Sequence, residues 1–366
     1  MSSPHADRRA RLQQLLGMRA GLITNPANVR YLSGYAGSNG LLCFANGEGR
    51  LLTDFRYANS VEPLRSELTV EIVDQALLGD VAARFGDLLG RGTVAFESDH
   101  LSHASWLGLD AAARAVGASL EPASGLVEGL RAVKDADEIA RIAAGAQITD
   151  AVYAYLSDLG LAGRSEAEVA RLIADRMLEL GAQGPAFASI VAAGANGASP
   201  HAVPGADEIE RDTLVVIDIG ARVDGYCSDC TRTFAIGHAD DTMREVYAVV
   251  LAAQEAALAA VQPGASCIEV HEIARRVIAD AGYAEHFNHG TGHGLGVEIH
   301  EEPRFRAGHG GELRPGNVVT VEPGIYLPGR FGVRIEDLVV VTETGARRAH
   351  ELSEIPPHDR LRIPRG

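Results

Sequence analysis

Short apolar runs alternate with longer amphipathic runs through the first 130 residues of the chain. The apolar stretches Gly40–Phe44 and Arg50–Thr53 flank a cluster of turn-forming residues, which predicts a β-hairpin. Thr93–Phe96 predicts a buried strand, whereas Leu77–Leu89 and Ala104–Val116 have the spacing of apolar positions that is typical of helices. Strands mixed with helices in this way predict an α/β domain.

The pattern changes at a polar segment, residues 131–138, which precedes a long helical stretch. We place a domain boundary there, giving an N-terminal domain of residues 1–130 and a C-terminal domain of residues 131–366. Ser165 and Glu168 have the sequence of a capping box at the start of a second helix. Strands and helices do not alternate strictly in the C-terminal domain, so we predict an α+β fold for it. Its expected helices are residues 138–159, 165–180, 241–261 and 267–282, and its expected strands are residues 187–192, 213–218 and 226–235, with a strand-rich region from 318 to 342.

Composition and charge narrow the class of protein. The 366 residues exceed what one hydrophobic core usually organises, which agrees with two domains. No apolar run reaches the ~20 residues that a membrane-spanning helix needs, and the N-terminal segment has the pattern of an amphipathic helix rather than a secretion signal. We therefore expect a cytoplasmic protein. The formal net charge of −16 argues against nucleic acid or an anionic membrane as a partner.

The four cysteines do not form a disulfide framework, which agrees with a reducing compartment. Cys227 and Cys230 make a C-x-x-C pair, which is a pattern of redox-active sites and of half a zinc site. The chain has no second pair of this kind, and this one lies in a strand-like run. We interpret both cysteines as incidental.

Two aspartates stand beside apolar strands in the C-terminal domain. Asp218 lies at the end of one predicted strand and Asp229 lies in the next, with the turn dipeptide Asp224–Gly225 between them. An antiparallel hairpin brings the two aspartates nearly opposite each other, where they repel unless one is protonated or a cation lies between them. For either aspartate alone, a carboxylate that accepts hydrogen bonds from backbone amides at a strand end is the commoner situation.

Two glutamates and a histidine extend the set. Glu322 and Glu336 are acids within apolar strand segments, where an unpaired charge is costly. An ion pair with Arg334, two residues away on the same strand face, is the alternative explanation for Glu336. His293 lies in a glycine-rich segment that lets backbone approach a ligand or metal closely; a solvated histidine in a flexible loop is the alternative. The segment lacks the Lys-Ser/Thr of a phosphate-binding loop.

Together these residues supply four carboxylates and one imidazole. Hard oxygen ligands with a single nitrogen suit two divalent ions such as Mn²⁺ or Co²⁺, with Zn²⁺ as a further possibility. Two ions about 3.5 Å apart bind a bridging water and lower its pKa, so that it becomes a nucleophile at neutral pH. The set therefore predicts a hydrolase.

At these residues the chain resembles the pita-bread metallopeptidases, which include methionine aminopeptidase, aminopeptidase P and prolidase. The family's ligands are Asp, Asp, His, Glu and Glu in that order, and the strings HGTGHGLGVEIHE, TVEPGIY and GVRIED resemble the proline-specific branch. Residues 31–40, YLSGYAGSNG, resemble a string in the creatinase-type α/β domain that precedes the catalytic domain in this branch. The resemblance covers nearly the whole chain. It implies as metal ligands Asp218, Asp229, His293, Glu322 and Glu336.

The resemblance also implies further roles. Glu322 accepts the proton of the attacking water and passes it toward the proline nitrogen, while His201 and His300 act as catalytic histidines that stabilise the oxyanion or move protons. His289 lines the substrate pocket, and Arg334 steadies the site. The family further implies a homodimer.

The function that we expect is an Xaa-Pro aminopeptidase, which removes the residue before a proline at the second position by attack of a metal-bridging hydroxide. The short Gly37–Gly40 string favours it over an Xaa-Pro dipeptidase. Arg304 favours the dipeptidase, because some prolidases place an arginine there for the substrate carboxylate; an exposed loop arginine is the alternative. A creatinase-like amidinohydrolase and a non-catalytic binding protein are less compatible with five retained ligands.

Overall fold

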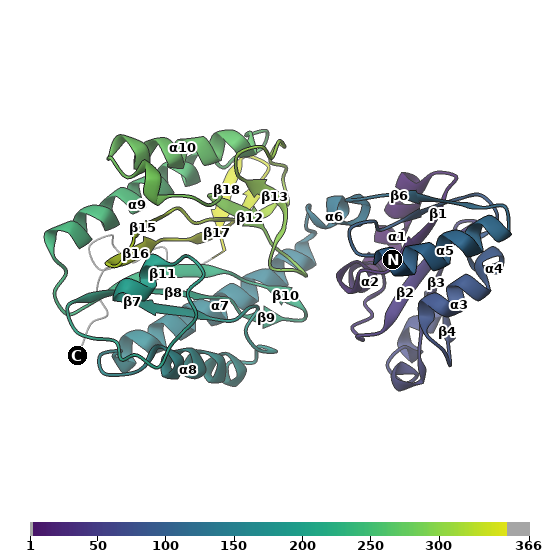
Figure 1. Cartoon of the computed structure of the whole chain (residues 1–366), viewed down its shortest axis with the longest axis horizontal. Coiled ribbons are helices and arrows are strands. Elements are labelled where there is room, and N and C mark those ends of the chain that lie inside the picture. Colours follow the sequence, from purple (N-terminus) through teal and green to yellow (C-terminus); the bar gives the residue numbers. More distant parts are fainter. Residues whose placement is uncertain (1–2, 350–366) are drawn as a thin grey trace. The chain divides into compact units, whose positions relative to one another are not determined.

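The computed structural model describes residues 3–349, and its internal contacts divide the chain into two units, Met1–Arg131 and Ala132–Gly366. Each unit has its own helices and sheets (Figure 1). No helix within residues 3–349 combines the length and the apolar character that crossing a bilayer requires.

The first unit is a six-stranded mixed sheet with helices on both faces (Figure 1). Side chains alternate along its strands: Leu41 and Cys43 pack with one helix layer, and Leu42 and Phe44 pack with the other. The strand order is β4-β3-β2-β1-β5-β6. The strands are β1 (Ala20–Ile23), β2 (Gly40–Ala45), β3 (Glu48–Thr53), β4 (Thr69–Ile72), β5 (Thr93–Phe96) and β6 (Ser119–Pro122), and the helices are α1 (Pro4–Leu16), α2 (Pro26–Ser33), α3 (Leu77–Ala83), α4 (Phe85–Leu89), α5 (His103–Ala115) and α6 (Leu126–Arg131).

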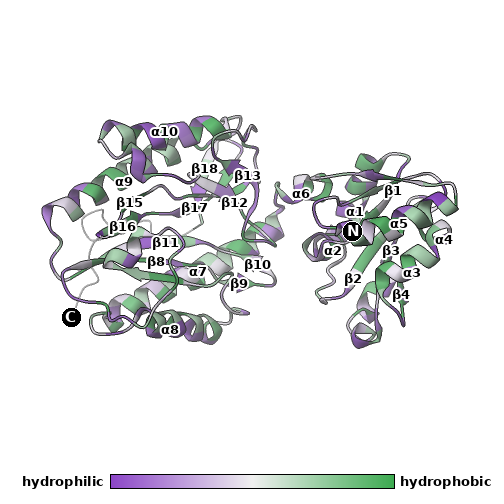
Figure 2. Cartoon of the chain, viewed as in Figure 1, coloured by the Kyte–Doolittle hydropathy of each residue, from purple (hydrophilic) through white to green (hydrophobic). Residues whose placement is uncertain are grey.

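The predicted hairpin of this unit is β2 and β3, joined at Asn46 and Gly47, which both have positive φ. The predicted strand at Thr93–Phe96 is β5. Hydrophobic residues follow the strands of the sheet in Figure 2, which agrees with burial of both of its faces.

The second unit has two layers of strands between two pairs of helices (Figure 1). The pair α7 (Ala136–Leu159) and α8 (Glu166–Glu179) packs with the sheet β11-β8-β7, and the pair α9 (Asp241–Ala260) and α10 (Cys267–Asp280) packs with the strands that follow. The strands are β7 (Ile190–Ala193), β8 (Thr213–Ile219), β9 (Arg222–Val223), β10 (Tyr226–Cys227), β11 (Cys230–Ile236), β12 (Gly292–Gly294), β13 (Glu301–Phe305), β14 (Val318–Val321), β15 (Gly324–Leu327), β16 (Phe331–Arg334), β17 (Asp337–Thr342) and β18 (Gly345–Arg348).

The predicted capping box at the start of α8 forms only in part. Ser165 accepts a hydrogen bond from the backbone N–H of Glu168, but the Glu168 carboxylate is paired with Arg164 instead. The complete capping box is at the start of α7, where Asp135 and Glu138 bond each other's backbone N–H.

The strand predicted over residues 226–235 is interrupted at Ser228 and Asp229. Cys227 N–H donates to the carbonyl of Gly296, and Ser228 N–H donates to the carbonyl of Ala221. The predicted strand is therefore divided into β10, which pairs with β9, and β11, which pairs with β8. Cys227 and Cys230 lie on either side of the interruption, and both side chains are buried. Because a continuous strand alternates its side chains, the interruption decides where Asp229 points.

A buried ion pair ties the start of the second unit to its later strands. Lys134 Nζ lies 3.1 Å from Glu301 Oε2, and the two side chains are 1% and 3% exposed. Glu301 Oε1 also accepts a hydrogen bond from Glu298 N–H, in the segment between β12 and β13. Removing one partner of such a pair leaves an uncompensated buried charge.

We expect Glu301→Gln to lower the free energy of unfolding of the second unit by about 3–5 kcal/mol, because Lys134 then has a neutral partner. Glu179→Gln, which removes a surface pair with Arg176, is the control and should change it by less than ~1 kcal/mol. Urea unfolding followed by circular dichroism measures the change. The single tryptophan, Trp106, lies in the first unit, so its fluorescence should keep the same midpoint. Equal effects of the two substitutions would contradict the prediction.

Candidate metal centre

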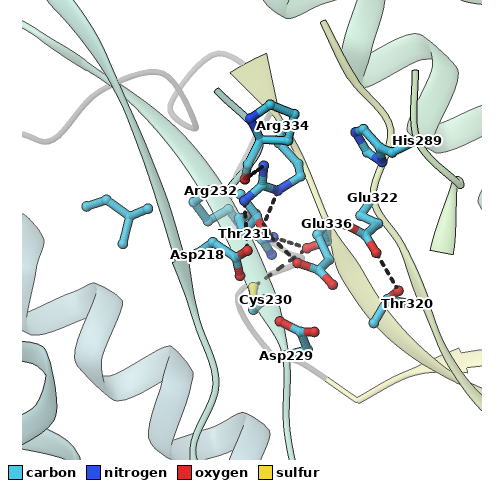
Figure 3. Close-up of polar contacts among 12 residues, drawn as sticks. Asp218, Asp229, Cys230, Thr231, Arg232, His289, Thr320, Glu322, Arg334 and Glu336 are labelled. Atoms are coloured by element: carbon cyan, nitrogen blue, oxygen red, sulfur yellow. Dashed lines mark hydrogen bonds and ion pairs between the residues drawn. The ribbon is translucent and has the colours of Figure 1, made fainter. Parts of the chain in front are cut away.

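The five residues predicted as ligands lie together. Oxygen atoms of Asp218, Asp229 and Glu336 are all within 4.8 Å of one another. His293 Nε2 lies 3.7 Å from Asp229 Oδ2 and 3.3 Å from Glu322 Oε1. Figure 3 shows the four carboxylates around one space, between strands from both layers of the unit.

The β8–β11 strand pair and the β9–β10 hairpin between these strands bring Asp218 and Asp229 to this space. Asp218 is on β8 and pairs in register with Thr231 of β11, so Asp229 lies just beyond the paired residues rather than opposite Asp218. The turn at Asp224 and Gly225, both with positive φ, closes the β9–β10 hairpin between them.

Threonine hydroxyls orient the two glutamates. Thr231 Oγ1 donates to Glu336 Oε2 at 2.8 Å, and Thr320 Oγ1 donates to Glu322 Oε1 at 3.2 Å (Figure 3). The backbone N–H of Glu322 donates to the carbonyl of Thr291 at 2.7 Å. Sequence reasoning did not select these threonines, because a threonine in a strand is commonplace there.

Arg334 is paired with Asp218 and not with Glu336. Its Nη2 lies 2.7 Å from Asp218 Oδ2, and its other nitrogens donate to Thr231 Oγ1, Tyr326 OH and the carbonyl of Pro200. The same-face ion pair considered as an explanation of Glu336 is therefore wrong. Arg334 is 3% exposed, so it is a buried positive charge beside the acids.

Burial controls the protonation of this cluster. It raises the pKa of Asp229 and of Glu336 well above the usual range, and the neighbouring carboxylates raise both pKa values further. Burial also raises the pKa of Glu322 to about 7, against the lowering effect of Arg334. These groups therefore retain protons near neutral pH unless positive charge is added among them.

The histidines shift in the opposite direction. Burial lowers the pKa of His289 and of His300 to about 4 and lowers the pKa of His293 as well. All three imidazoles are therefore neutral at pH 7, and the neutral ring is the form that binds a metal.

The donor atoms fit divalent cations. Asp218 Oδ1 and Glu336 Oε1 are buried and accept no hydrogen bond from any residue between 3 and 349. Buried carboxylate oxygens in this state are costly unless a cation lies beside them. A set of carboxylate oxygens with one imidazole suits Mn²⁺, Co²⁺ or Zn²⁺.

A cavity of about 490 Å³ is lined by three of the carboxylate residues, Asp218, Asp229 and Glu322. Among the other residues predicted for the site, His201, His289, His300 and Arg304 line it, and so does Arg334. The ring of His300 makes an edge contact with His293, with centroids 4.5 Å apart. The structure thus brings every predicted site residue to one place.

Several cavity residues were not predicted. Tyr326 OH donates a hydrogen bond to His289 Nε2 at 3.0 Å, because the proton of the neutral ring is on Nδ1, which donates to the carbonyl of Gly290. Phe187 and Ile190 form an apolar wall of the cavity. Tyr326 was within reach of sequence reasoning, because it lies four residues after Glu322 beyond a Pro-Gly bend. Phe187 and Ile190 carry no comparable sequence signal, since apolar residues near a strand are usually core.

Each of the two units matches the model of a known protein family. Residues 140–343 match the model of metallopeptidase family M24, and residues 8–133 match the creatinase/prolidase N-terminal domain. The chain belongs to metallopeptidase family M24.

Relatives and solved structures agree with this membership. The uncharacterized peptidase YqhT of Bacillus subtilis is 38% identical, and the match covers 91% of this chain and 93% of that protein. The Xaa-Pro dipeptidase of Pyrococcus furiosus is 44% identical, and the match covers 61% of this chain and 64% of that protein. An Xaa-Pro dipeptidase from Bacillus anthracis has a TM-score of 0.89 at 35% identity, covering 95% of this chain and 98% of that one. An X-Pro aminopeptidase from Thermotoga maritima has a TM-score of 0.83 at 33% identity, with the same coverages.

These comparisons confirm the predicted family, its proline-specific branch and the fold class. The fold is an α+β pita-bread unit preceded by a creatinase-type α/β domain. Membership of metallopeptidase family M24 also confirms the prediction of a metal-dependent peptidase.

Metal binding should displace protons from the carboxyl groups whose pKa values are raised by burial. At pH 6.5 we expect Mn²⁺ to release at least one proton per centre from chelator-treated protein, and the apparent affinity to rise with pH between 6 and 8. Calorimetric titrations in two buffers of different ionisation enthalpy count the protons. Glu322→Gln should release fewer. A binding heat that is the same in both buffers at pH 6.5 would rule out this protonation scheme.

Proposed function

We propose that this protein is an Xaa-Pro dipeptidase that works with two divalent metal ions. The aminopeptidase preferred from the sequence gives way, because several relatives carry dipeptidase or prolidase names over most of this chain. The observation that carries the proposal is Arg304, which lines the cavity and lies in register with His293 on the neighbouring strand. A guanidinium there suits the free carboxylate of a dipeptide.

The proposed ligands are Asp218, Asp229, His293, Glu322 and Glu336. When bound, the ions supply Lewis acidity and a lowered pKa of water, which is the chemistry that hydrolysis of an amide needs. Mn²⁺ is the metal that we expect, with Co²⁺ or Zn²⁺ as alternatives. Arg334 offsets the charge of Asp218, so the centre needs less added positive charge than four free carboxylates would.

The remaining groups have roles that follow from their protonation. Glu322 lines the cavity, and its ionised carboxylate can accept a proton from water and deliver it to the proline nitrogen. His300 and His201 line the cavity, and a ring N–H from either can donate to the developing oxyanion. His289, held by Tyr326, forms the wall beside them.

The dipeptidase and the aminopeptidase differ at the carboxyl end of the substrate. A dipeptidase recognises the carboxylate of proline itself, whereas an aminopeptidase leaves room for a further residue. The similarity to the X-Pro aminopeptidase of Thermotoga maritima keeps the aminopeptidase as the second candidate. Substrates with proline at the second position, a homodimer and a cytoplasmic location stay predictions.

Replacing a proposed metal ligand should abolish activity. We expect Asp229→Ala and Glu336→Ala each to reduce hydrolysis of an Xaa-Pro dipeptide by at least ~10³-fold, because the centre loses a charge that holds the ions. Metal analysis should show a lower metal content, and circular dichroism should show a retained fold. Normal turnover in either variant would mean that the ligand assignment is wrong.

Arg304 should act on the dipeptide specifically. We expect Arg304→Ala to raise KM for an Xaa-Pro dipeptide by ~10–100-fold, because a charge-assisted hydrogen bond to its carboxylate is lost. The matched Xaa-Pro amide lacks that charge, so its hydrolysis should change little. Wild-type protein that prefers an Xaa-Pro-Pro tripeptide to the dipeptide would instead support the aminopeptidase. Wild-type protein that is loaded with metal and cleaves neither would exclude both.

A further inference from the structure

A buried carboxylate outside the metal centre holds one wall of the cavity. Glu166 is the first residue of α8 and is 3% exposed. Its Oε1 accepts a hydrogen bond from Ala193 N–H at 2.8 Å. Its Oε2 accepts from Asn196 Nδ2 at 2.7 Å and from Gly205 N–H at 2.8 Å. One side chain thus binds three donors that lie up to 39 residues away in the sequence.

These donors bracket one segment, residues 193–205, which we call the His201 segment. It starts at the end of β7, includes the short helix η3 (Gly194–Ala198) and carries His201 and Val203 into the lining of the cavity. The backbone of α8 adds a second attachment at the far end, because Ala167 N–H donates to the carbonyl of Gly205 at 2.9 Å.

The middle of the segment is held from the opposite side. The carbonyl of Pro200 accepts a hydrogen bond from Arg334 Nη1 at 3.1 Å, and Arg334 is the partner of Asp218. Gly332 of β16 lies so close that a Cβ there would be 1.9 Å from the carbonyl oxygen of Gly197. The His201 segment is therefore fixed by α8 at both ends and by β16 in between.

The His201 imidazole itself is exposed, so its position over the cavity depends on the backbone that carries it. We propose that Glu166 is a positioning residue for His201: it fixes the His201 segment so that the ring faces the reacting carbonyl. This inference rests on the proposed peptidase function and on the role of His201 within it. Displacing a catalytic group by about 1 Å can cost ~10²-fold in rate.

The test is Glu166→Gln, with Glu168→Gln as the matched control. The amide keeps one acceptor oxygen, but its NH₂ group must face an N–H donor, so at least one of the three bonds is lost. Glu168 lies in the same helical turn and pairs with Arg164 on the surface. We expect Glu166→Gln to lower kcat for an Xaa-Pro dipeptide by ~10–100-fold with KM within threefold and unchanged metal content. Glu168→Gln should match the wild type.

Two further measurements separate positioning from general damage. In a His201→Ala background, Glu166→Gln should cause less than a threefold further loss of kcat, because the positioned group is already absent. Adding Asn196→Asp to Glu166→Gln should recover part of the lost rate, since the new carboxylate accepts from the glutamine NH₂. A loss of the same size with and without His201 would overturn the proposal, and so would normal kcat in Glu166→Gln.

Hydrogen exchange of backbone amides in residues 194–205 gives a result that does not need activity. We expect faster exchange there in Glu166→Gln than in the wild type and in Glu168→Gln, with unchanged exchange in α9. Unchanged exchange in the segment would overturn the proposal even if the enzyme is active. Wild-type protein that cleaves no Xaa-Pro peptide, together with faster exchange in the variant, would refute the proposed function but leave the anchoring by Glu166 in place. Should Glu166→Gln fail to fold, Asn196→Ala removes one of the three bonds from the other side and should lower kcat by a smaller factor.

Discussion

Four carboxylates share one buried space in the second unit, where their negative charges repel one another. Asp218, Asp229 and Glu336 place oxygens within 4.8 Å of one another, a distance at which like charges out of water oppose each other strongly. One resident positive charge, that of Arg334, offsets part of this repulsion by pairing with Asp218. Burial, and after it the remaining repulsion, raises the pKa values of Asp229 and Glu336, and bound cations would reverse this shift.

Two layers of strands are needed to build this space. Asp218 and Asp229 come from the layer packed on α7 and α8. The other layer, packed near α9 and α10, supplies His293 on β12, Glu322 directly after β14 and Glu336 directly before β17. Thr231 holds Glu336 across the two layers, Thr320 holds Glu322, and Arg334 holds Asp218. The centre therefore depends on the register of the strands and would be lost with a slip of one residue.

Much of this was predictable from sequence, because acids in apolar strands and a turn dipeptide are local signals. The hairpin at Asp224 and the ligands in their glycine-rich and Pro-Gly contexts are examples. The interruption at Ser228 was not predictable. It depends on hydrogen bonds from Ser228 to Ala221 and from Cys227 to Gly296, and Gly296 lies far along the chain. Nor was the partner of Arg334: a same-strand neighbour was the natural candidate, and the tertiary fold supplied Asp218 instead.

The preferred substrate depends on finer detail than the fold. Arg304 was weighed from the sequence against a short glycine string; the string favoured the aminopeptidase, whereas relatives with dipeptidase names favour the alternative. The role of Glu166 leaves no trace in the sequence, because an acid in the first turn of a helix is common for local reasons. Its three partners are visible only once β7 and the His201 segment are folded against α8.

The place of Glu166 at the first position of α8 has an electrostatic consequence. The aligned peptide dipoles of a helix amount to roughly half a positive charge at its N-terminus. A buried anion at that position is stabilised by the helix as well as by its three neutral donors, so no arginine or lysine is needed beside it. An anchor of this kind is enclosed by protein and little screened by dissolved ions, and its strength should therefore hardly vary with the salt concentration around the enzyme.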